Sequence, residues 1–262
     1  MRGALIAAAL LLGQAAQAAP RVMSLDQCSD QYVLALSPRE AIVGVSPRVD
    51  DRDSYLREKA AGLPQRRATA ESVLAAGPDV VVRYWGGDAR LAETLERRGV
   101  RVVRIEEAQD FDGVRANVRR VAQALDQRAA GEAMVARIDA DLAEASGAWG
   151  GRRALYMTPG GFTAGGGTLI GAILAAAGLK SVAGPGYAPV SLEGLALNPP
   201  AAMVLGFFDN FATAMERWGP GRHRVVSRLA REKAVGSLPG AIAGCPGWFA
   251  ADGALMLAKA AR

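Results

Sequence analysis

The sequence predicts an α/β protein made of two similar lobes. Apolar segments of strand length alternate with helical segments in both halves of the chain, which is typical of parallel sheets covered by helices. The stretch at residues 71–87 recurs at residues 191–210, about half a chain later. A repeat at this distance indicates two lobes, because the period of a solenoid is far shorter. A long helical segment separates the two copies.

The two copies share one layout. Each begins with a helix-capping hydroxyl, followed by a glutamate, a short apolar helix and a proline that cannot continue the helix. An apolar run without alternation comes next, at residues 79–82 and 201–204, and predicts a strand that is covered on both faces. The aligned residues are Thr69 with Ser191, Glu71 with Glu193 and Pro78 with Pro200.

The carboxyl end of the first of these strands is a candidate binding segment. It consists of Tyr84, Trp85, Gly86 and Gly87. Ligands of open α/β sheets lie beyond the carboxyl ends of the strands, and glycine lets the backbone turn tightly there. We therefore expect a bound molecule at this end of the sheet.

The N-terminus predicts export. Residues 1–19 combine a charged start at Arg2, an apolar core and the small-x-small site Ala16-Gln17-Ala18, as in a secretory signal peptide. The apolar run is too short to span a bilayer, so we expect a soluble exported protein. The net charge is +5, but the arginines are scattered among acidic residues, which argues against nucleic-acid binding.

The remaining elements of the first lobe follow in order. Apolar runs predict strands at residues 22–25, 41–45 and 100–105, and helical patterns lie at 29–36 and 89–98. The polar segment 46–67 predicts surface helix and loop.

A helical pattern then runs through residues 111–148. Its second part, residues 127–147, would be about 31 Å long at 1.5 Å per residue, which favours a rigid strut between the lobes over an ordinary crossover helix. We therefore divide the chain into a signal peptide (1–19), an N-terminal lobe (20–126), a connecting helix (127–148) and a C-terminal lobe (149–262).

The second lobe opens with a predicted strand at residues 153–157. The glycine-rich segment 158–167 lacks a phosphate-binding motif and predicts an irregular loop beside the cleft. Helices are predicted at residues 168–177, around 211–218 and around 225–233. Trp248 and Phe249 are expected in a turn before a C-terminal helix.

These features together resemble a known family. The segments RVMSLDQCSDQYVLAL, ESVLAAGPDVVV and SLEGLALNPPAAMVLG, with the single long helix between them, are similar to the class III periplasmic substrate-binding proteins of ABC importers. These proteins carry cobalamin, ferric siderophores or haem. The resemblance covers the mature chain and implies two Rossmann-like α/β lobes joined by one long α-helix, with the ligand in the cleft between the lobes.

The resemblance also implies a role for the two repeated glutamates. In this family an acidic residue on each lobe pairs with arginines of the membrane permease, and Glu71 and Glu193 occupy the matching positions. A glutamate in the first turn of a helix also complements the helix dipole, which is the simpler explanation for either residue alone. The equivalent positions of the two glutamates, one on each lobe, favour a role in docking to the permease.

Candidate ligand contacts come from the same resemblance. Bulky metal chelates suit aromatic walls, which provide a large contact area. The residues expected to line the cleft are Asp26, Gln27, Cys28, Tyr84, Trp85, Gly86, Phe162, Phe207, Phe208, Trp248 and Phe249. An aromatic residue at a strand end can equally be part of the core.

Cys28 and Cys245 are expected to approach each other near the cleft. A disulfide is the first of three interpretations, since export permits one. The other two are a thiol pair that ligates the metal of a chelate and two inert side chains.

The cargo is expected to be a metal chelate, with cobalamin favoured. The single histidine, His223, is not in a cleft-like position, so haem would depend on a tyrosine such as Tyr84. Cobalamin is already fully ligated and needs no metal ligand from the protein, so none is assigned. The lack of an arginine cluster argues against carboxylate-rich siderophores.

Other classes fit the sequence less well. A hydrolase would need a nucleophile and a base, and no Gly-x-Ser-x-Gly motif is present. A chelatase or a zinc- or manganese-binding protein would need converging histidines and carboxylates. We expect a monomeric carrier without catalytic residues or a cofactor of its own, whose partners are its cargo and the permease.

Overall fold

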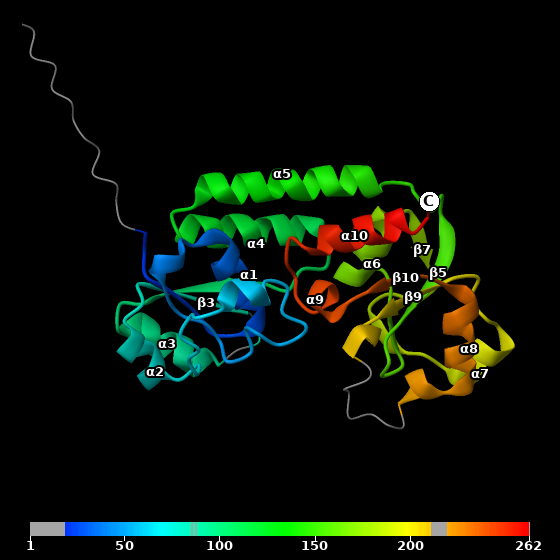
Figure 1. The fold of residues 1–262 in the computed structure, drawn as a ribbon, viewed down its shortest axis with the longest axis horizontal. Helices are drawn as coiled ribbons and strands as arrows, with labels where there is room; N and C mark the ends of the chain where they lie inside the picture. The colour runs from blue at the N-terminus through cyan, green and yellow to red at the C-terminus, as the bar shows by residue number, and fades with distance from the viewer. Residues whose placement is uncertain (1–18, 85, 87, 211–218, 262) are drawn as a thin grey trace, which may run out of the picture.

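The computed structural model describes residues 19–84, 86, 88–210 and 219–261. It is an α/β protein with two lobes, each built around a four-stranded parallel sheet (Figure 1). Three predicted parts lie outside the described residues: residues 1–18 of the expected signal peptide, Trp85 and Gly87 of the candidate binding segment, and the helix around 211–218. Within the described residues, no helix is both long enough and apolar enough to span a membrane.

The N-terminal sheet has the strand order β2-β1-β3-β4. Val80 and Val82 of β3 pack in the cluster that contains α1 and α4, whereas Val81 faces the cluster that contains α2 and α3. The absence of alternation in this strand is therefore explained by burial on both faces. The elements are β1 Val22–Ser24, α1 Gln27–Leu36, β2 Ile42–Gly44, α2 Ala70–Ala76, β3 Val80–Tyr84, α3 Ala89–Arg97, β4 Arg101–Ile105 and α4 Phe111–Ala124.

The C-terminal sheet has the strand order β10-β9-β5-β7. Helices α6 and α10 cover one face, and α7 and α8 cover the other. The elements are β5 Arg152–Met157, β6 Phe162–Ala164, α6 Leu169–Ala176, β7 Leu179–Ser181, β8 Tyr187–Pro189, α7 Leu192–Leu197, β9 Met203–Gly206, α8 Arg224–Lys233, β10 Ala234–Leu238, α9 Gly240–Ala243 and α10 Ala250–Lys259. Short 3-10 helices are described at η1 Arg39–Ala41, η2 Arg57–Ala60, η3 Phe208–Asn210 and η4 Pro220–Arg222.

One prediction for this lobe is corrected. The glycine-rich segment expected to be an irregular loop contains β6, which pairs with β8 in an antiparallel two-stranded sheet. Neither strand is longer than three residues, so neither carries a clear alternation in the sequence. The pairing places Phe162 opposite Pro189 and Thr163 opposite Ala188.

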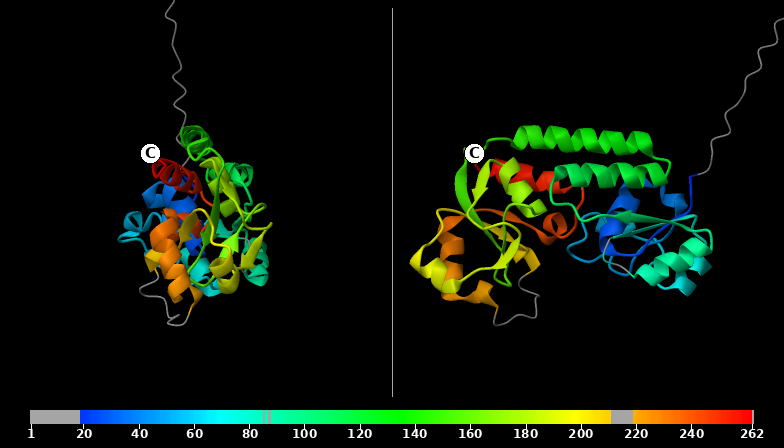
Figure 2. Two further views of the ribbon diagram at one scale, coloured as in Figure 1. Left: turned by 90° about the vertical axis from the view of Figure 1, so that its right-hand side faces the viewer. Right: turned by 180° about the vertical axis from the view of Figure 1, so that it is seen from behind.

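Helix α5 (Arg128–Ala145) joins the lobes, as the sequence predicts. Its 18 residues span about 27 Å at 1.5 Å per residue. It packs against α4 of the first lobe and α10 of the second. Figure 1 and the right-hand view of Figure 2 show it running across the two lobes. Close approach to α4 depends on Gly131, because a Cβ there would overlap with Ala122.

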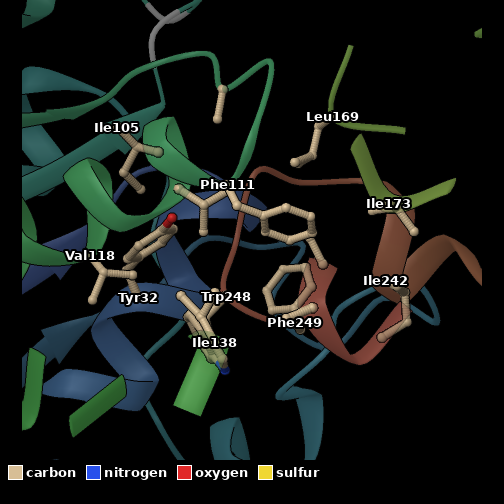
Figure 3. Packing of buried hydrophobic residues seen from close by; sticks show 14 of the residues in the cluster. Tyr32, Ile105, Phe111, Val118, Ile138, Leu169, Ile173, Ile242, Trp248 and Phe249 are labelled. Carbon is tan, nitrogen blue, oxygen red and sulfur yellow. The ribbon is translucent and has the colours of Figure 1, made fainter. Parts of the chain in front are cut away.

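An aromatic cluster packs where the two lobes meet (Figure 3). Trp248 lies edge-on to Tyr32 with the ring centroids 5.5 Å apart, and Phe249 stacks on Tyr55 at 4.6 Å. Trp248 and Phe249 are only 6% and 1% exposed. The sequence predicts that both rings line the cleft, but neither is among the described residues that line the spaces between the lobes. A fully buried ring removes more apolar surface from water than a ring on a cleft wall does, so burial in the core is the more stabilising position.

Candidate functional site

A cavity of about 480 Å³ lies between the lobes. This volume is within the range typical of small-molecule sites. It is bordered by the carboxyl ends of strands from both sheets, where ligands of α/β proteins bind. The lining residues are Asp26, Gln27, Cys28, Arg48, Asp53 and Tyr84 from the first lobe and Tyr156, Thr158, Phe162, Thr163, Ile170, Tyr187, Phe207, Ala243 and Gly244 from the second.

The structure brings most of the expected contact residues to this cavity. Asp26, Gln27, Cys28, Tyr84, Phe162 and Phe207 all line it. Gly86 and Phe208 are not among the described lining residues, and Phe208 begins η3. Trp85 lies outside the described residues.

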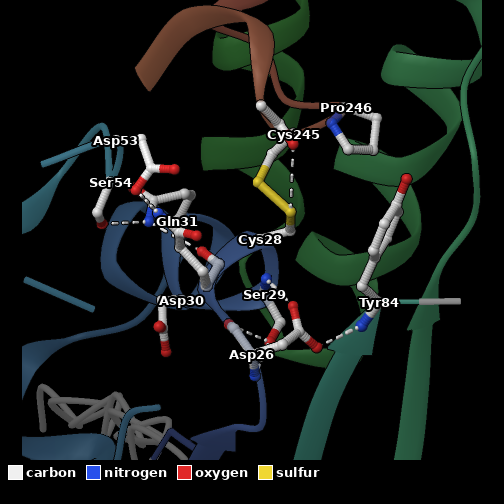
Figure 4. Close-up of a disulfide and its surroundings, with 12 residues drawn as sticks. Asp26, Cys28, Ser29, Asp30, Gln31, Asp53, Ser54, Tyr84, Cys245 and Pro246 are labelled. Atoms are coloured by element: carbon white, nitrogen blue, oxygen red, sulfur yellow. Dashed lines mark hydrogen bonds between the residues drawn. A yellow bond between two sulfur atoms is a disulfide. The ribbon is translucent and has the colours of Figure 1, made fainter. Parts of the chain in front are cut away.

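Asp26 organises the wall formed by the first lobe (Figure 4). One carboxylate oxygen caps α1 by accepting a hydrogen bond of 2.9 Å from the Ser29 amide, as aspartate at a helix N-cap commonly does. The other oxygen accepts a bond of 2.7 Å from the Tyr84 amide. The start of α1 and the end of β3 are therefore held together, and Gln27 is fixed by a bond of 2.7 Å to Asp53.

Glu107 and Tyr187, which the sequence analysis missed, line a hollow that adjoins the cavity. The Tyr84 hydroxyl donates a hydrogen bond to Glu107, which follows β4. Tyr187 lies on β8 of the opposite lobe, and its pKa is raised by partial burial and by the negative charge of Glu107. A smaller hollow of about 90 Å³ is lined by all three side chains. Glu107 follows the end of a predicted strand, so the rule that ligands lie beyond the carboxyl ends of strands could have identified it. Tyr187 belongs to the two-stranded sheet of β6 and β8, which the sequence did not predict.

A disulfide joins Cys28, which lines the cavity, to Cys245, which lines the adjoining hollow (Figure 4). Cys28 lies in α1 of the first lobe, and Cys245 lies in the turn that leads to α10 of the second. The bond therefore ties the lobes together beside the cavity. Thiols that ligate a metal are excluded at these positions, because both sulfur atoms are bonded.

The cavity lining is acidic. Three carboxylates, from Asp26, Asp53 and Glu107, belong to the cavity or to the adjoining hollow. Arg48 is the one basic residue among the described lining residues of these two spaces, and it forms an ion pair of 2.7 Å with Asp51. The described residues contain no cluster of three or more histidine, cysteine or acidic side chains that could hold a metal ion.

Phe207 reaches the cavity from a strained backbone position. Its φ angle is +62°, in the left-handed region that bulky residues rarely adopt. Its amide donates a bond of 3.0 Å to Leu238, which holds this conformation at the end of β9. Backbone strain of this kind occurs often at ligand sites, where the surrounding structure maintains it.

Two variants of Phe207 separate the effect of backbone strain on stability from the effect of losing the aromatic ring. Phe207→Ala and Phe207→Gly both remove the ring, but only glycine adopts this φ without a Cβ clash. We expect Phe207→Gly to be about 1 kcal/mol more stable than Phe207→Ala in chemical denaturation. Equal stability, or a more stable alanine variant, would show that the backbone at this position is unstrained.

The two repeated glutamates occupy matching exposed positions. Thr69 caps α2 and Ser191 caps α7, and Glu71 and Glu193 lie in the first turns of these helices. Both glutamates are exposed. Helices α2 and α7 lie on the side of the molecule opposite to α5, one on each lobe (Figure 1).

Comparisons with known proteins identify the family. The family model described as "Periplasmic binding protein" matches residues 22–215. No protein of curated function matches the chain in sequence.

Solved structures share the fold over nearly the whole chain. The periplasmic heme-binding protein RhuT from Roseiflexus sp. RS-1 has a TM-score of 0.71 and 20% identity, covering 94% of this chain and 100% of its own. A periplasmic heme-binding protein from Pseudomonas aeruginosa has a TM-score of 0.65 and 24% identity, covering 93% of this chain and 92% of its own. The periplasmic vitamin B12-binding protein BtuF of Vibrio cholerae has a TM-score of 0.64 and 15% identity, covering 93% of this chain and 96% of its own.

Proposed function

Because the chain belongs to the periplasmic binding protein family, we propose that it captures cobalamin in the cleft between its lobes and delivers it to an ABC permease. The family consists of substrate-binding transport proteins, and we propose that this chain catalyses no reaction. In this proposal residues 1–19 direct export to the periplasm, and the mature protein is a monomer.

The observation that carries the choice of cargo is the acidic lining of the cavity. Asp26, Asp53 and Glu107 provide three carboxylates, whereas Arg48 is the one basic residue among the described lining residues and is already paired with Asp51. Haem has two propionates, which these carboxylates would repel. Cobalamin instead has neutral amide side chains around its corrin ring, and an amide N–H₂ group donates hydrogen bonds to carboxylates. The lining therefore favours cobalamin over haem and over carboxylate siderophores.

The other features of the cavity are consistent with a bulky planar cargo. Tyr84, Phe162, Tyr187 and Phe207 provide aromatic surface from both lobes. Aromatic walls supply a large contact area with little loss of side-chain entropy. Cobalamin is already fully ligated and therefore requires no metal ligand from the protein.

Haem is the second candidate. The phenol of Tyr84 is an oxygen donor suited to ferric iron, and its hydrogen bond to Glu107 would help it to lose its proton. Four of the similar structures are described as heme-binding proteins, and one is described as a vitamin B12-binding protein.

Calorimetric titration of the mature protein distinguishes these cargoes. We expect saturable binding of one cyanocobalamin per chain, with weaker or no binding of haemin and of ferric siderophores. Tight binding of haemin alone would replace cobalamin by haem as the cargo. Flat titrations with every probe would contradict the carrier function.

A further inference from the structure

The Cys28–Cys245 disulfide joins two segments that themselves line the spaces between the lobes. Residues 26–28 at the start of α1 and residues 243–244 at the end of α9 line the cavity, and Cys245 follows directly and lines the adjoining hollow. Both cysteines are half-buried. The bond therefore fixes the distance between one lining segment of each lobe and does not join the lobes at a remote point (Figure 4).

Both segments are held firmly within their own lobes. In the first lobe, Asp26 connects the start of α1 to the end of β3. In the second lobe, the carboxylate of Asp209 accepts hydrogen bonds of 3.1 and 3.3 Å from the Gly240 amide at the start of α9. Gly253 lets α10 approach α9 closely, because a Cβ there would overlap with Ile242. The disulfide is therefore anchored in a well-supported segment on each side.

The lobes are also joined without the disulfide. One turn further along α1, the Tyr32 hydroxyl donates a bond of 2.5 Å to the Pro246 carbonyl, and Trp248 packs edge-on against the Tyr32 ring. Tyr32 is fully buried, whereas Cys28 lines the cavity. The disulfide therefore adds a restraint at the cavity wall to lobes that the core already holds together.

A covalent restraint at the wall differs from the noncovalent contacts behind it. Hydrogen bonds and packed rings break and re-form when parts of a protein open locally. A disulfide persists through such openings, so the lobes can pivot about it but cannot separate there. A cleft whose walls are already held in place loses less conformational freedom when it binds a ligand, and its affinity is higher for that reason.

We propose that Cys28 and Cys245 are positioning residues, whose bond holds one lining segment of each lobe in place for the cargo. This inference rests on the proposed carrier function and goes beyond the contribution of the bond to stability. Breaking the bond should weaken cargo binding in a protein that is still folded, chiefly through faster release of the cargo.

Reduction of the wild-type protein is the direct test, because it breaks the bond and retains every side chain that lines the cavity. Dithiothreitol converts the disulfide to two thiols and is itself oxidised to a cyclic disulfide, and the excess reagent is then removed under nitrogen. We expect calorimetry to give an affinity for cyanocobalamin about tenfold weaker than that of the oxidised protein, equivalent to about 1.4 kcal/mol. Re-oxidation should restore the affinity.

The Cys28→Ala/Cys245→Ala variant should show the same loss without any reagent. Its release rate is measured by stopped-flow from cargo-saturated protein, because bound cargo stabilises the folded state and offsets the lower stability of this variant. We expect release to be about ten times faster than from the oxidised wild-type protein.

Leu95→Ala separates positioning from stability. Leu95 is fully buried in α3 and is not among the described residues that line the cavity or the adjoining hollow. The void that this substitution leaves lowers the stability of the folded state, as the loss of a disulfide does. The variant should bind and release cyanocobalamin as the wild-type protein does, and reduction should weaken its binding to the same extent.

The outcomes separate the positioning role from the choice of cargo. Wild-type affinity in the reduced protein and in the double cysteine variant would overturn the positioning role even if cobalamin binds. Equal weakening in oxidised Leu95→Ala would also overturn it, because affinity would then follow stability. If the wild-type protein binds haemin instead, the choice of cobalamin fails, and the same comparison with haemin decides the positioning role. Absence of binding of every probe to the oxidised wild-type protein would overturn both proposals.

Discussion

The Glu71→Ala/Glu193→Ala variant is expected to bind cobalamin with wild-type affinity and to support no import above background. The two glutamates are exposed, lie in the first turns of α2 and α7, and are not among the described residues that line the cavity. We propose that each pairs with an arginine of the permease. Truncating one member of a charge pair that becomes desolvated on docking costs about 2–5 kcal/mol. Losing both pairs should reduce import at least a hundredfold.

The measurement is uptake of labelled cobalamin by vesicles that contain the permease, with calorimetry on the same protein samples. Glu132→Ala/Glu144→Ala provides a matched control, because it also removes two exposed glutamates but from α5, on the opposite side of the molecule. The control should import at the wild-type rate. Wild-type import by the Glu71→Ala/Glu193→Ala variant would rule out docking through these residues.

Replacing both cysteines is expected to have the largest effect on stability. The Cys28–Cys245 bond joins residues 217 positions apart, so it strongly restricts the unfolded chain. For so long a loop, the chain-entropy argument gives about 5 kcal/mol. We expect Cys28→Ala/Cys245→Ala to lose about 4–5 kcal/mol of unfolding free energy in urea denaturation followed by circular dichroism.

Reduction provides the control for this experiment. A reducing agent should destabilise the wild-type protein by a similar amount and leave the double variant unchanged. A double variant as stable as the oxidised wild-type protein would show that the bond does not contribute to the stability of the folded state.

The sequence was sufficient to predict the two-lobed fold. The repeated helix and strand around Glu71 and Glu193 were recognisable because their capping residues, prolines and apolar runs lie at the same spacing. The long helix was recognisable because its apolar residues recur at helical intervals. Such local patterns follow from secondary-structure geometry and do not require knowledge of tertiary contacts.

The site was only partly predictable, because its walls depend on contacts between the lobes. Trp248 and Phe249 are aromatic residues of the kind that line binding sites, but their rings are buried against Tyr32 and Tyr55. Tyr156 and Thr163 line the cavity and were missed, because nothing in the sequence shows which side chains of β5 and β6 reach it. Their position is fixed only once β5, β6 and β9 are placed together.

Calorimetric titration of cyanocobalamin into the wild-type protein and into Ala243→Trp examines whether cargo is held between the lobes. Ala243 lies on α9 and lines both the cavity and the adjoining hollow, so an indole at this position would fill the space that the cargo requires. We predict one tight site in the wild-type protein and none in a variant of comparable Tm. Equal affinity in both proteins would contradict binding in the cleft.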